Sequence, residues 1–238
     1  GQRESKPFTH AVIDEAQDLG VPELRMLASI TPDGPDALFF AGDLGQRIFQ
    51  EPFSWKALGV DIRGRSRTLK VNYRTSHQIR QAADRLLPKV VLDVDQNEQD
   101  RRGTVSVFNG PDPVVQTFPD AERESKGVAE WIKAAVADGV SPAEIGIFVR
   151  SNDQLVRARA AVKAAGHTQL ELSERLEQPQ GRVAIGTMHL AKGLEYKAVV
   201  VMACDDEIIP LQNRIESVAD DADLEEVYNT ERHLLYVA

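Results

Sequence analysis

The stretch "HAVIDEAQDLG", residues 10–20, decides how we expect the chain to fold. Its apolar run at 11–13 is typical of a short buried strand, and two adjacent carboxylates, Asp14 and Glu15, follow it, with a third at Asp18. Carboxylates directly after a buried strand often hold a metal ion, commonly Mg²⁺ together with the phosphates of a nucleotide. The stretch therefore predicts an α/β fold in which a strand end carries a phosphate-handling site.

Similar apolar runs alternate with helical patterns along the 238 residues. We expect strands at 11–13, 37–41, 105–108, 145–149, 183–185 and 198–203. Helices are expected at 23–30, 76–87, 122–136 and 153–165, and Thr75 and Gln78 have the spacing of a capping box at the second of them. The alternation predicts an α/β sandwich around a mainly parallel sheet.

The polar stretch "DIRGRSRT", residues 61–68, is the expected boundary between two domains. Only two predicted strands precede it, which is too few for an independent parallel sheet. Residues 1–66 are therefore interpreted as part of a first domain, and residues 67–238 as most of a second. Residues 93–103 are expected to form an exposed loop.

The composition is that of an ordinary globular protein, with 42% hydrophobic and 27% charged residues. No apolar run approaches the ~18 residues that a membrane helix needs, so no membrane association is expected. The single cysteine, Cys204, excludes an internal disulfide and favours a reducing, cytoplasmic setting without a disulfide-linked partner. Cys204 itself is expected to be a small buried side chain at a strand end.

Charge is distributed unevenly along the chain. The net charge is −9, yet residues 61–85 hold seven Lys or Arg against two Asp, whereas residues 205–231 hold ten acidic residues against one Arg. A basic segment can bind phosphates while an acidic segment elsewhere maintains solubility, but each run by itself is equally typical of a solvated surface.

The phosphate-binding loop that a nucleotide site requires does not occur in the sequence. That loop has the pattern G-x-x-x-x-G-K-[ST], and its backbone N–H groups surround the phosphates. The dipeptide Gly-Lys is found nowhere in the 238 residues. We therefore expect the loop to lie in a missing N-terminal part of a parent protein, and the chain alone to be inactive as a nucleotide hydrolase.

Four further segments place polar side chains beside predicted strands: "FFAGDLGQRIF" at 39–49, "LKVNYRTSHQI" at 69–79, "GTMHLAKGLEYKAVVV" at 186–201 and "ERHLLYVA" at 231–238. Taken singly, each has an ordinary structural interpretation, such as a strand-to-loop turn, a surface Tyr-Arg pair or a structural histidine. Tyr73 could nevertheless stack on a base, and Arg74 could contact a phosphate through its planar guanidinium. No His or Cys accompanies His189 at zinc-like spacing, so a transition-metal site is not expected.

In this order the segments resemble the motifs of UvrD/Rep-type superfamily 1 DNA helicases. "DEAQD" is similar to motif II, "GDLGQRIF" to motif III, "LKVNYRTS" to motif IV, "TMHLAKGLEY" to motif V and "ERHLLYVA" to the first part of motif VI. The resemblance implies two RecA-like domains, the first incomplete, with ATP bound between them. It also implies a parent that uses ATP and Mg²⁺ to move 3′→5′ along single-stranded DNA, as in DNA repair.

The resemblance implies roles for the residues that would handle ATP. Asp14 would bind Mg²⁺, and Glu15 would orient and deprotonate the attacking water. Gln46 would contact the γ-phosphate, and Arg74 would act as an arginine finger. Tyr73 would stack on the adenine.

Other positions would contact the ribose and the DNA. Glu195 would bind the ribose, while Thr187 and His189 would lie along the DNA backbone. Phe49 and Trp55 would stack on single-stranded bases, a contact worth ~1–3 kcal/mol per base.

Two functions of other classes are compatible with parts of the sequence. A non-catalytic helicase-like module could bind nucleic acid or protein, but it would not need Glu15, Gln46 and Arg74. A Mg²⁺-dependent nuclease could use the carboxylates within 14–18 or 205–207, but it would not explain the Tyr-Arg pair. The helicase interpretation accounts for all five segments.

Overall fold

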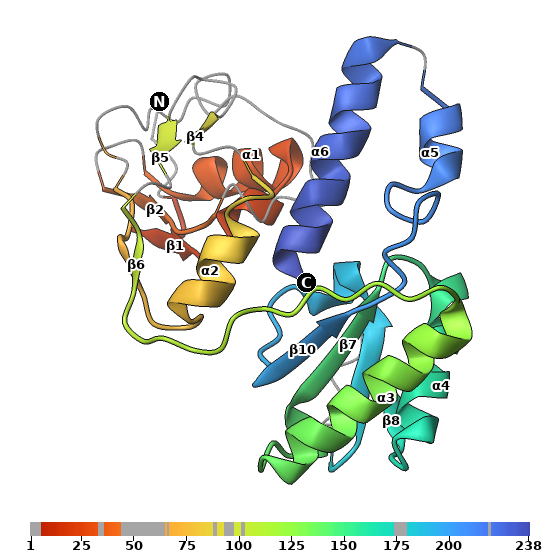
Figure 1. Cartoon of the computed structure of the whole chain (residues 1–238). Helices are drawn as coiled ribbons and strands as arrows, with labels where there is room; N and C mark the ends of the chain where they lie inside the picture. The colour runs from red at the N-terminus through yellow and green to blue at the C-terminus, as the bar shows by residue number, and fades with distance from the viewer. Residues whose placement is uncertain are drawn as a thin grey trace, which may run out of the picture. The chain divides into compact units, whose positions relative to one another are not determined.

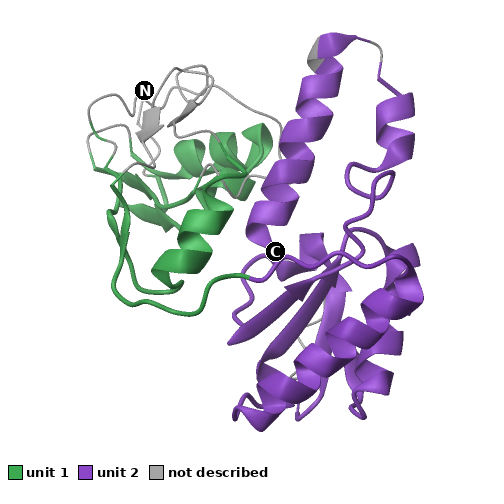
Figure 2. Ribbon diagram, viewed as in Figure 1, with its two compact units in different colours: residues 1–113 green, residues 114–238 purple. Residues whose placement is uncertain are grey.

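The structure is a computed structural model, which describes residues 6–32, 36–43, 65, 67–87, 90–92, 98–100, 103–173, 180–218 and 220–238. The chain divides into two compact units, Gly1–Pro113 and Val114–Ala238 (Figure 2). Parallel strands flanked by helices predominate in the described parts, which confirms the expected α/β class (Figure 1). The domain boundary expected at residues 66 and 67 lies within the first unit and stays a prediction.

The described part of the first unit contains short strands and the helices α1 and α2. Its described strands pair two by two: β1 pairs with β2 and β3 with β6, both in parallel, while β4 and β5 are antiparallel. The described elements are β1 (Ala11–Ile13), η1 (Ala16–Asp18), α1 (Val21–Ile30), β2 (Leu38–Phe40), β3 (Val71–Asn72), α2 (His77–Ala83), β4 (Val90–Leu92), β5 (Glu98–Asp100) and β6 (Val105–Ser106).

One face of the β1–β2 sheet is covered and the other is exposed. Leu24 of α1 is buried against Ala16 and the β2 residue Phe40. Val12 and Phe39 lie opposite each other in the sheet and alternate with the covered positions, so both are exposed. The expectation that these strands are buried on both faces is therefore wrong.

The second unit is a four-stranded parallel sheet in the order β10-β7-β9-β8. Its described elements are α3 (Ala121–Ala137), η4 (Pro142–Glu144), β7 (Ile145–Val149), η5 (Asn152–Gln154), α4 (Leu155–Ala164), β8 (Gln169–Glu171), β9 (Val183–Thr187), η6 (Met188–Ala191), β10 (Ala198–Val201), α5 (Gln212–Glu216) and α6 (Asp221–Val237).

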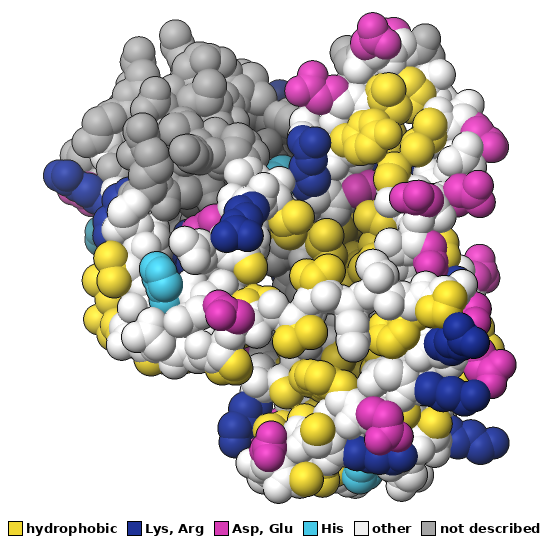
Figure 3. All heavy atoms as spheres, in the orientation of Figure 1, with side chains coloured by type: hydrophobic (Ala, Val, Ile, Leu, Met, Phe, Trp, Pro, Cys, Tyr) yellow, Lys and Arg dark blue, Asp and Glu magenta, His cyan; other side chains and the backbone are white. Residues whose placement is uncertain are grey.

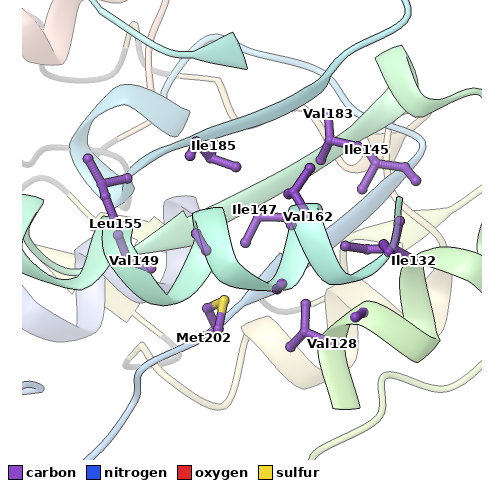
Figure 4. Packing of buried hydrophobic residues seen from close by; sticks show 14 of the residues in the cluster. Val128, Ile132, Ile145, Ile147, Val149, Leu155, Val162, Val183, Ile185 and Met202 are labelled. Carbon is purple, nitrogen blue, oxygen red and sulfur yellow. The ribbon is translucent and has the colours of Figure 1, made fainter. Parts of the chain in front are cut away.

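The core of the second unit lies between this sheet and the helices α3 and α4 (Figure 4). β7 is a central strand, and all five of its residues are buried. Ile147 of β7 packs in one cluster with Ile132 of α3 and Val162 of α4, each fully buried. Burying a side chain of this size stabilises the fold by ~1.5–3 kcal/mol, so these contacts fix the sheet edge at which β7 and β9 end.

Several element boundaries differ from the sequence-based expectations. Helix α2 is capped by Ser76, whose Oγ accepts from the backbone N–H of Ile79 at 3.4 Å, so the capping box between Thr75 and Gln78 is wrong. Gln78 instead accepts a hydrogen bond from the backbone N–H of Gly110 at 2.9 Å. The helix ends at Ala83 rather than at residue 87.

The expected ranges leave out several elements of the structure, among them the strands β4, β5 and β8 and the helices α5 and α6. β5 lies within the predicted loop at 93–103, because antiparallel pairing with β4 orders a polar segment that has no apolar pattern. β8 is three residues long and only one of them is buried, so its apolar signal is weak. Helix α6 contains most of the segment 231–238, to which the sequence assigned a motif but no helix. Acidic side chains gather around α5 and α6, at the upper right of Figure 3.

No helix within the described ranges combines the length and the apolar character needed to cross a membrane.

Candidate functional site

Asp14 lies directly after β1 with an exposed side chain. Its Oδ1 accepts the backbone N–H of Glu15 at 2.9 Å, and its other oxygen makes no hydrogen bond to the described residues. A carboxylate presented at a strand end fits the hard-oxygen chemistry of Mg²⁺. Within the described ranges no three His, Cys, Asp or Glu side chains converge as a metal site, so neither acid triple of the nuclease alternative is assembled there.

Glu15 has an unusual backbone conformation, with φ 49° and ψ 41°. This is the left-handed region, which costs a residue other than glycine about 1–3 kcal/mol and occurs mainly where surrounding contacts maintain it. The Glu15 side chain is exposed, as a group that meets a ligand must be. Asp14 and Glu15 thus differ in backbone conformation, since only Glu15 is left-handed. This difference is compatible with different roles for the two carboxylates.

Gln17 is a residue of this turn to which the sequence assigned no role. It lies in η1 and is only 3% exposed, and its Nε2 donates to Glu15 Oε2 at 2.5 Å. The signal that could have revealed it is an amide inside an acidic motif, next to a strand end. The bond limits how the Glu15 carboxylate can turn.

Tyr73 and Arg74 lie in the loop between β3 and α2, and both side chains are exposed. Asn72 organises this loop, because its Oδ1 accepts from the backbone N–H groups of Arg74 at 2.8 Å and Thr75 at 3.3 Å. Its Nδ2 also donates to the Thr75 hydroxyl. A side-chain amide that bonds the backbone two and three residues ahead forms an Asx turn, so the pair is presented on an ordered loop.

Thr187 and His189 lie together where β9 runs into η6, at the carboxyl edge of the second unit's sheet. Both are half-buried. Burial and the nearby Arg150 guanidinium lower the pKa of His189 below its usual value, which favours the neutral imidazole.

Glu195 is exposed and lies between η6 and β10. Its neighbour Tyr196 packs its ring over the backbone of Gly146 in β7 and edge-on against Phe148, with ring centroids 5.8 Å apart. A Cβ at Gly146 would lie 2.7 Å from the Tyr196 ring, so a glycine is needed there. This packing anchors the segment that carries Glu195 to the central strand.

A buried ion pair joins the carboxyl end of β7 to helix α6. Arg150 donates from Nε to Glu231 Oε2 and from Nη2 to Glu231 Oε1, both at 2.6 Å, and the two side chains are 5% and 3% exposed. Arg214 of α5 also reaches Glu231 Oε1 at 3.4 Å. The pair spans 81 residues of sequence, and no local pattern could have predicted it.

Breaking this buried pair is expected to destabilise the second unit strongly. Glu231→Ala leaves the Arg150 charge buried without its partner, which should lower the free energy of unfolding by about 3–5 kcal/mol. The matched control is Glu171→Ala, because Arg159 and Glu171 form a similar two-bond pair that is 44% and 43% exposed. An exposed pair contributes ~0–1 kcal/mol. Urea unfolding followed by far-UV circular dichroism measures the free energy of unfolding of both variants, and equal losses would contradict the prediction.

Three predicted site residues, Gln46, Phe49 and Trp55, lie outside the described residues. Cys204 is exposed in the segment that follows β10, so the expectation that it is buried is wrong.

The C-terminal third of the chain is similar to a known protein family. The family profile of the UvrD-like helicase C-terminal domain matches residues 163–238, which include Thr187, His189 and Glu195. The chain is also similar to a solved structure, the C-terminal domain of a possible DNA helicase from Lactobacillus plantarum WCFS1. The identity is 20% and the TM-score 0.42, with 68% of this chain and 81% of that chain covered. No curated protein matches. Residues 163–238 are therefore similar to the UvrD-like helicase C-terminal domain, the type of protein that the motifs indicate.

Proposed function

We propose that the chain is part of an ATP-dependent DNA helicase or translocase that moves 3′→5′ along single-stranded DNA. The observation that carries the proposal is the family match at residues 163–238. Glu15, which follows β1, has a strained backbone and a side chain that accepts a hydrogen bond from Gln17. Both features support a role for Glu15 in ATP hydrolysis. The proposal includes a cytoplasmic setting, supported by the single cysteine, and two RecA-like domains at 1–66 and 67–238.

The first unit supplies the residues that act on ATP. Asp14 holds Mg²⁺, which neutralises charge on the phosphates when it is bound. Glu15 orients the attacking water and takes a proton from it. Tyr73 stacks on the adenine, and Arg74 places its guanidinium on the phosphate oxygens. Gln46 is assigned to the γ-phosphate from sequence alone.

The second unit supplies contacts to DNA and to the ribose. Thr187 and His189 hydrogen-bond to the DNA backbone from the end of β9. Because His189 is neutral, its loss should reduce affinity with little change in salt dependence. Glu195 binds the ribose. Phe49 and Trp55, which belong to the first unit, are assigned to base stacking from sequence alone.

The test is made on the intact parent protein, which must also supply the phosphate-binding loop. ATP hydrolysis should rise on addition of single-stranded DNA, and duplexes with a 3′ single-stranded tail should be unwound in preference to those with a 5′ tail. DNA binding without hydrolysis would instead favour the non-catalytic module. Mg²⁺-dependent strand cleavage without ATP would favour the nuclease.

The 238-residue chain alone is expected to show no DNA-stimulated ATPase activity and only weak ATP binding. Without a phosphate-binding loop, the β- and γ-phosphates lose the N–H nest and the lysine that provide most of their binding energy. Phosphate release and ATP titration of the purified chain measure both properties. DNA-stimulated turnover that follows the chain through purification and disappears in Glu15→Gln would refute the expectation.

A further inference from the structure

The amide of Gln17 is buried at the point where the segment after β1 meets the end of β2. While Nε2 donates to Glu15 Oε2 at 2.5 Å, Oε1 accepts the backbone N–H of Asp43 at 3.0 Å. Asp43 lies three residues beyond the end of β2. One buried side chain therefore links the Glu15 carboxylate directly to the backbone that leaves the neighbouring strand.

The orientation of this amide is fixed by its two partners. Turned over, it would set its carbonyl oxygen against the Glu15 carboxylate and its NH₂ group against the N–H of Asp43. Both contacts would then be repulsive and buried, which is costly. Gln17 is consequently a directional link, with its donor toward Glu15 and its acceptor toward Asp43.

Gly42 makes room for the link. A Cβ at Gly42 would lie 2.3 Å from Gln17 Oε1 and 3.3 Å from the backbone nitrogen of Ala16. The same approach allows the backbone N–H of Ala16 to donate to the carbonyl oxygen of Ala41 at 2.8 Å. The segments that follow β1 and β2 are thus joined through both backbone and side chain.

Among the described residues, the link engages only one of the two carboxylate oxygens of Glu15. Glu15 Oε2 is occupied by Gln17, whereas Oε1 makes no hydrogen bond to the described residues. The strained backbone of Glu15 and the bond from Gln17 together restrict the carboxylate to a narrow range of positions. A proton acceptor in phosphoryl transfer needs such a restriction, because a displacement of about 1 Å can cost 10²-fold in rate.

We propose that Gln17 is the positioning residue of the hydrolytic site. It holds Oε2 of Glu15 so that Oε1 is the atom that takes the proton of the attacking water, and it ties this carboxylate to the chain at Asp43. A shift of the backbone at Asp43 would then move the proton acceptor. This inference rests on the proposed function for its catalytic meaning, but the link itself can be tested without activity.

The link is tested first on the 238-residue chain by NMR. The side-chain NH₂ resonances of Gln17 should differ between the wild-type chain and Glu15→Ala, which removes the acceptor of the Gln17 amide. Exchange of the Asp43 backbone amide with solvent should accelerate in Gln17→Met, which has similar length but no hydrogen bonds. The control, Gln78→Met, should accelerate exchange at Gly110 and leave Asp43 unchanged. Gln17 resonances that do not respond to Glu15 would overturn the link.

The catalytic consequence is tested on the intact parent. Gln17→Met should lower kcat up to about 10²-fold with KM for ATP nearly unchanged, because binding does not depend on the position of the proton acceptor. Gln17→Glu should lower kcat as well, although it retains an acceptor for Asp43, because it sets a second carboxylate against Glu15. Normal turnover in both variants, with Glu15→Gln inactive, would overturn the positioning role alone. A wild-type parent without ATPase activity would overturn the proposed function, and with it the catalytic role of Gln17, while the NMR result would still decide the link.

Discussion

Arg74→Ala in the intact parent is expected to slow DNA-stimulated ATP hydrolysis by about 10³-fold or more, the usual cost of losing an arginine finger. Affinity for ATP should stay within several-fold of the wild-type value, because the phosphate-binding loop and stacking on Tyr73 bind ATP before hydrolysis. Arg74 is exposed on a loop that Asn72 orders, so the alanine variant should remain folded. The measurement is kcat for ATP hydrolysis together with equilibrium ATP binding.

Two further variants make this prediction specific to the guanidinium. Arg74→Lys should restore little activity, since an ammonium group cannot bond two phosphate oxygens at once. Arg80→Ala removes a cation six residues further on, which pairs at 2.8 Å with Asp84, the residue that follows α2, and should leave turnover unchanged. An Arg74→Lys variant close to wild type would show that Arg74 is not an arginine finger.

The parts of the fold that sequence predicted well are those determined by local apolar pattern. β1 and β7 coincide with the expected ranges, because each is an apolar run bounded by polar residues. α3 was placed within one residue at each end. The expectations failed where pairing rather than pattern decides the structure, as in the polar strand β5 and in the exposed faces of β1 and β2.

In the candidate site, too, short motifs predicted some features, whereas others depend on the folded chain. The position of Asp14 and Glu15 after β1, and of Tyr73 and Arg74 between β3 and α2, followed from short motifs. The left-handed backbone of Glu15 did not, because glutamate carries no preference for that conformation. The links made by Gln17 to Asp43 and by Arg150 to Glu231 join residues 26 and 81 positions apart, so only the folded chain reveals them.

Asp14 and Glu15 are adjacent but are expected to do different work, and replacing them should separate binding from hydrolysis. Asp14→Asn removes an anionic ligand from a hard cation and should weaken binding of Mg²⁺ with ATP. Glu15→Gln keeps the shape of the side chain, and its amide oxygen can still accept from Gln17, but it cannot take a proton. It should therefore bind ATP while hydrolysis falls by about 10²–10⁴-fold, the usual contribution of a general base, and strand separation should stop.

The most direct measurement pairs ATP affinity with single-turnover hydrolysis for both variants of the intact parent, at one fixed salt concentration because DNA binding depends on salt. We predict that Asp14→Asn loses affinity for Mg²⁺ and ATP, whereas Glu15→Gln retains affinity and traps unhydrolysed ATP on DNA. If Glu15→Gln lost affinity while Asp14→Asn still hydrolysed ATP, the two roles would be exchanged. Unchanged hydrolysis in both variants would contradict the assignment of "DEAQD" as the ATP-hydrolysing motif.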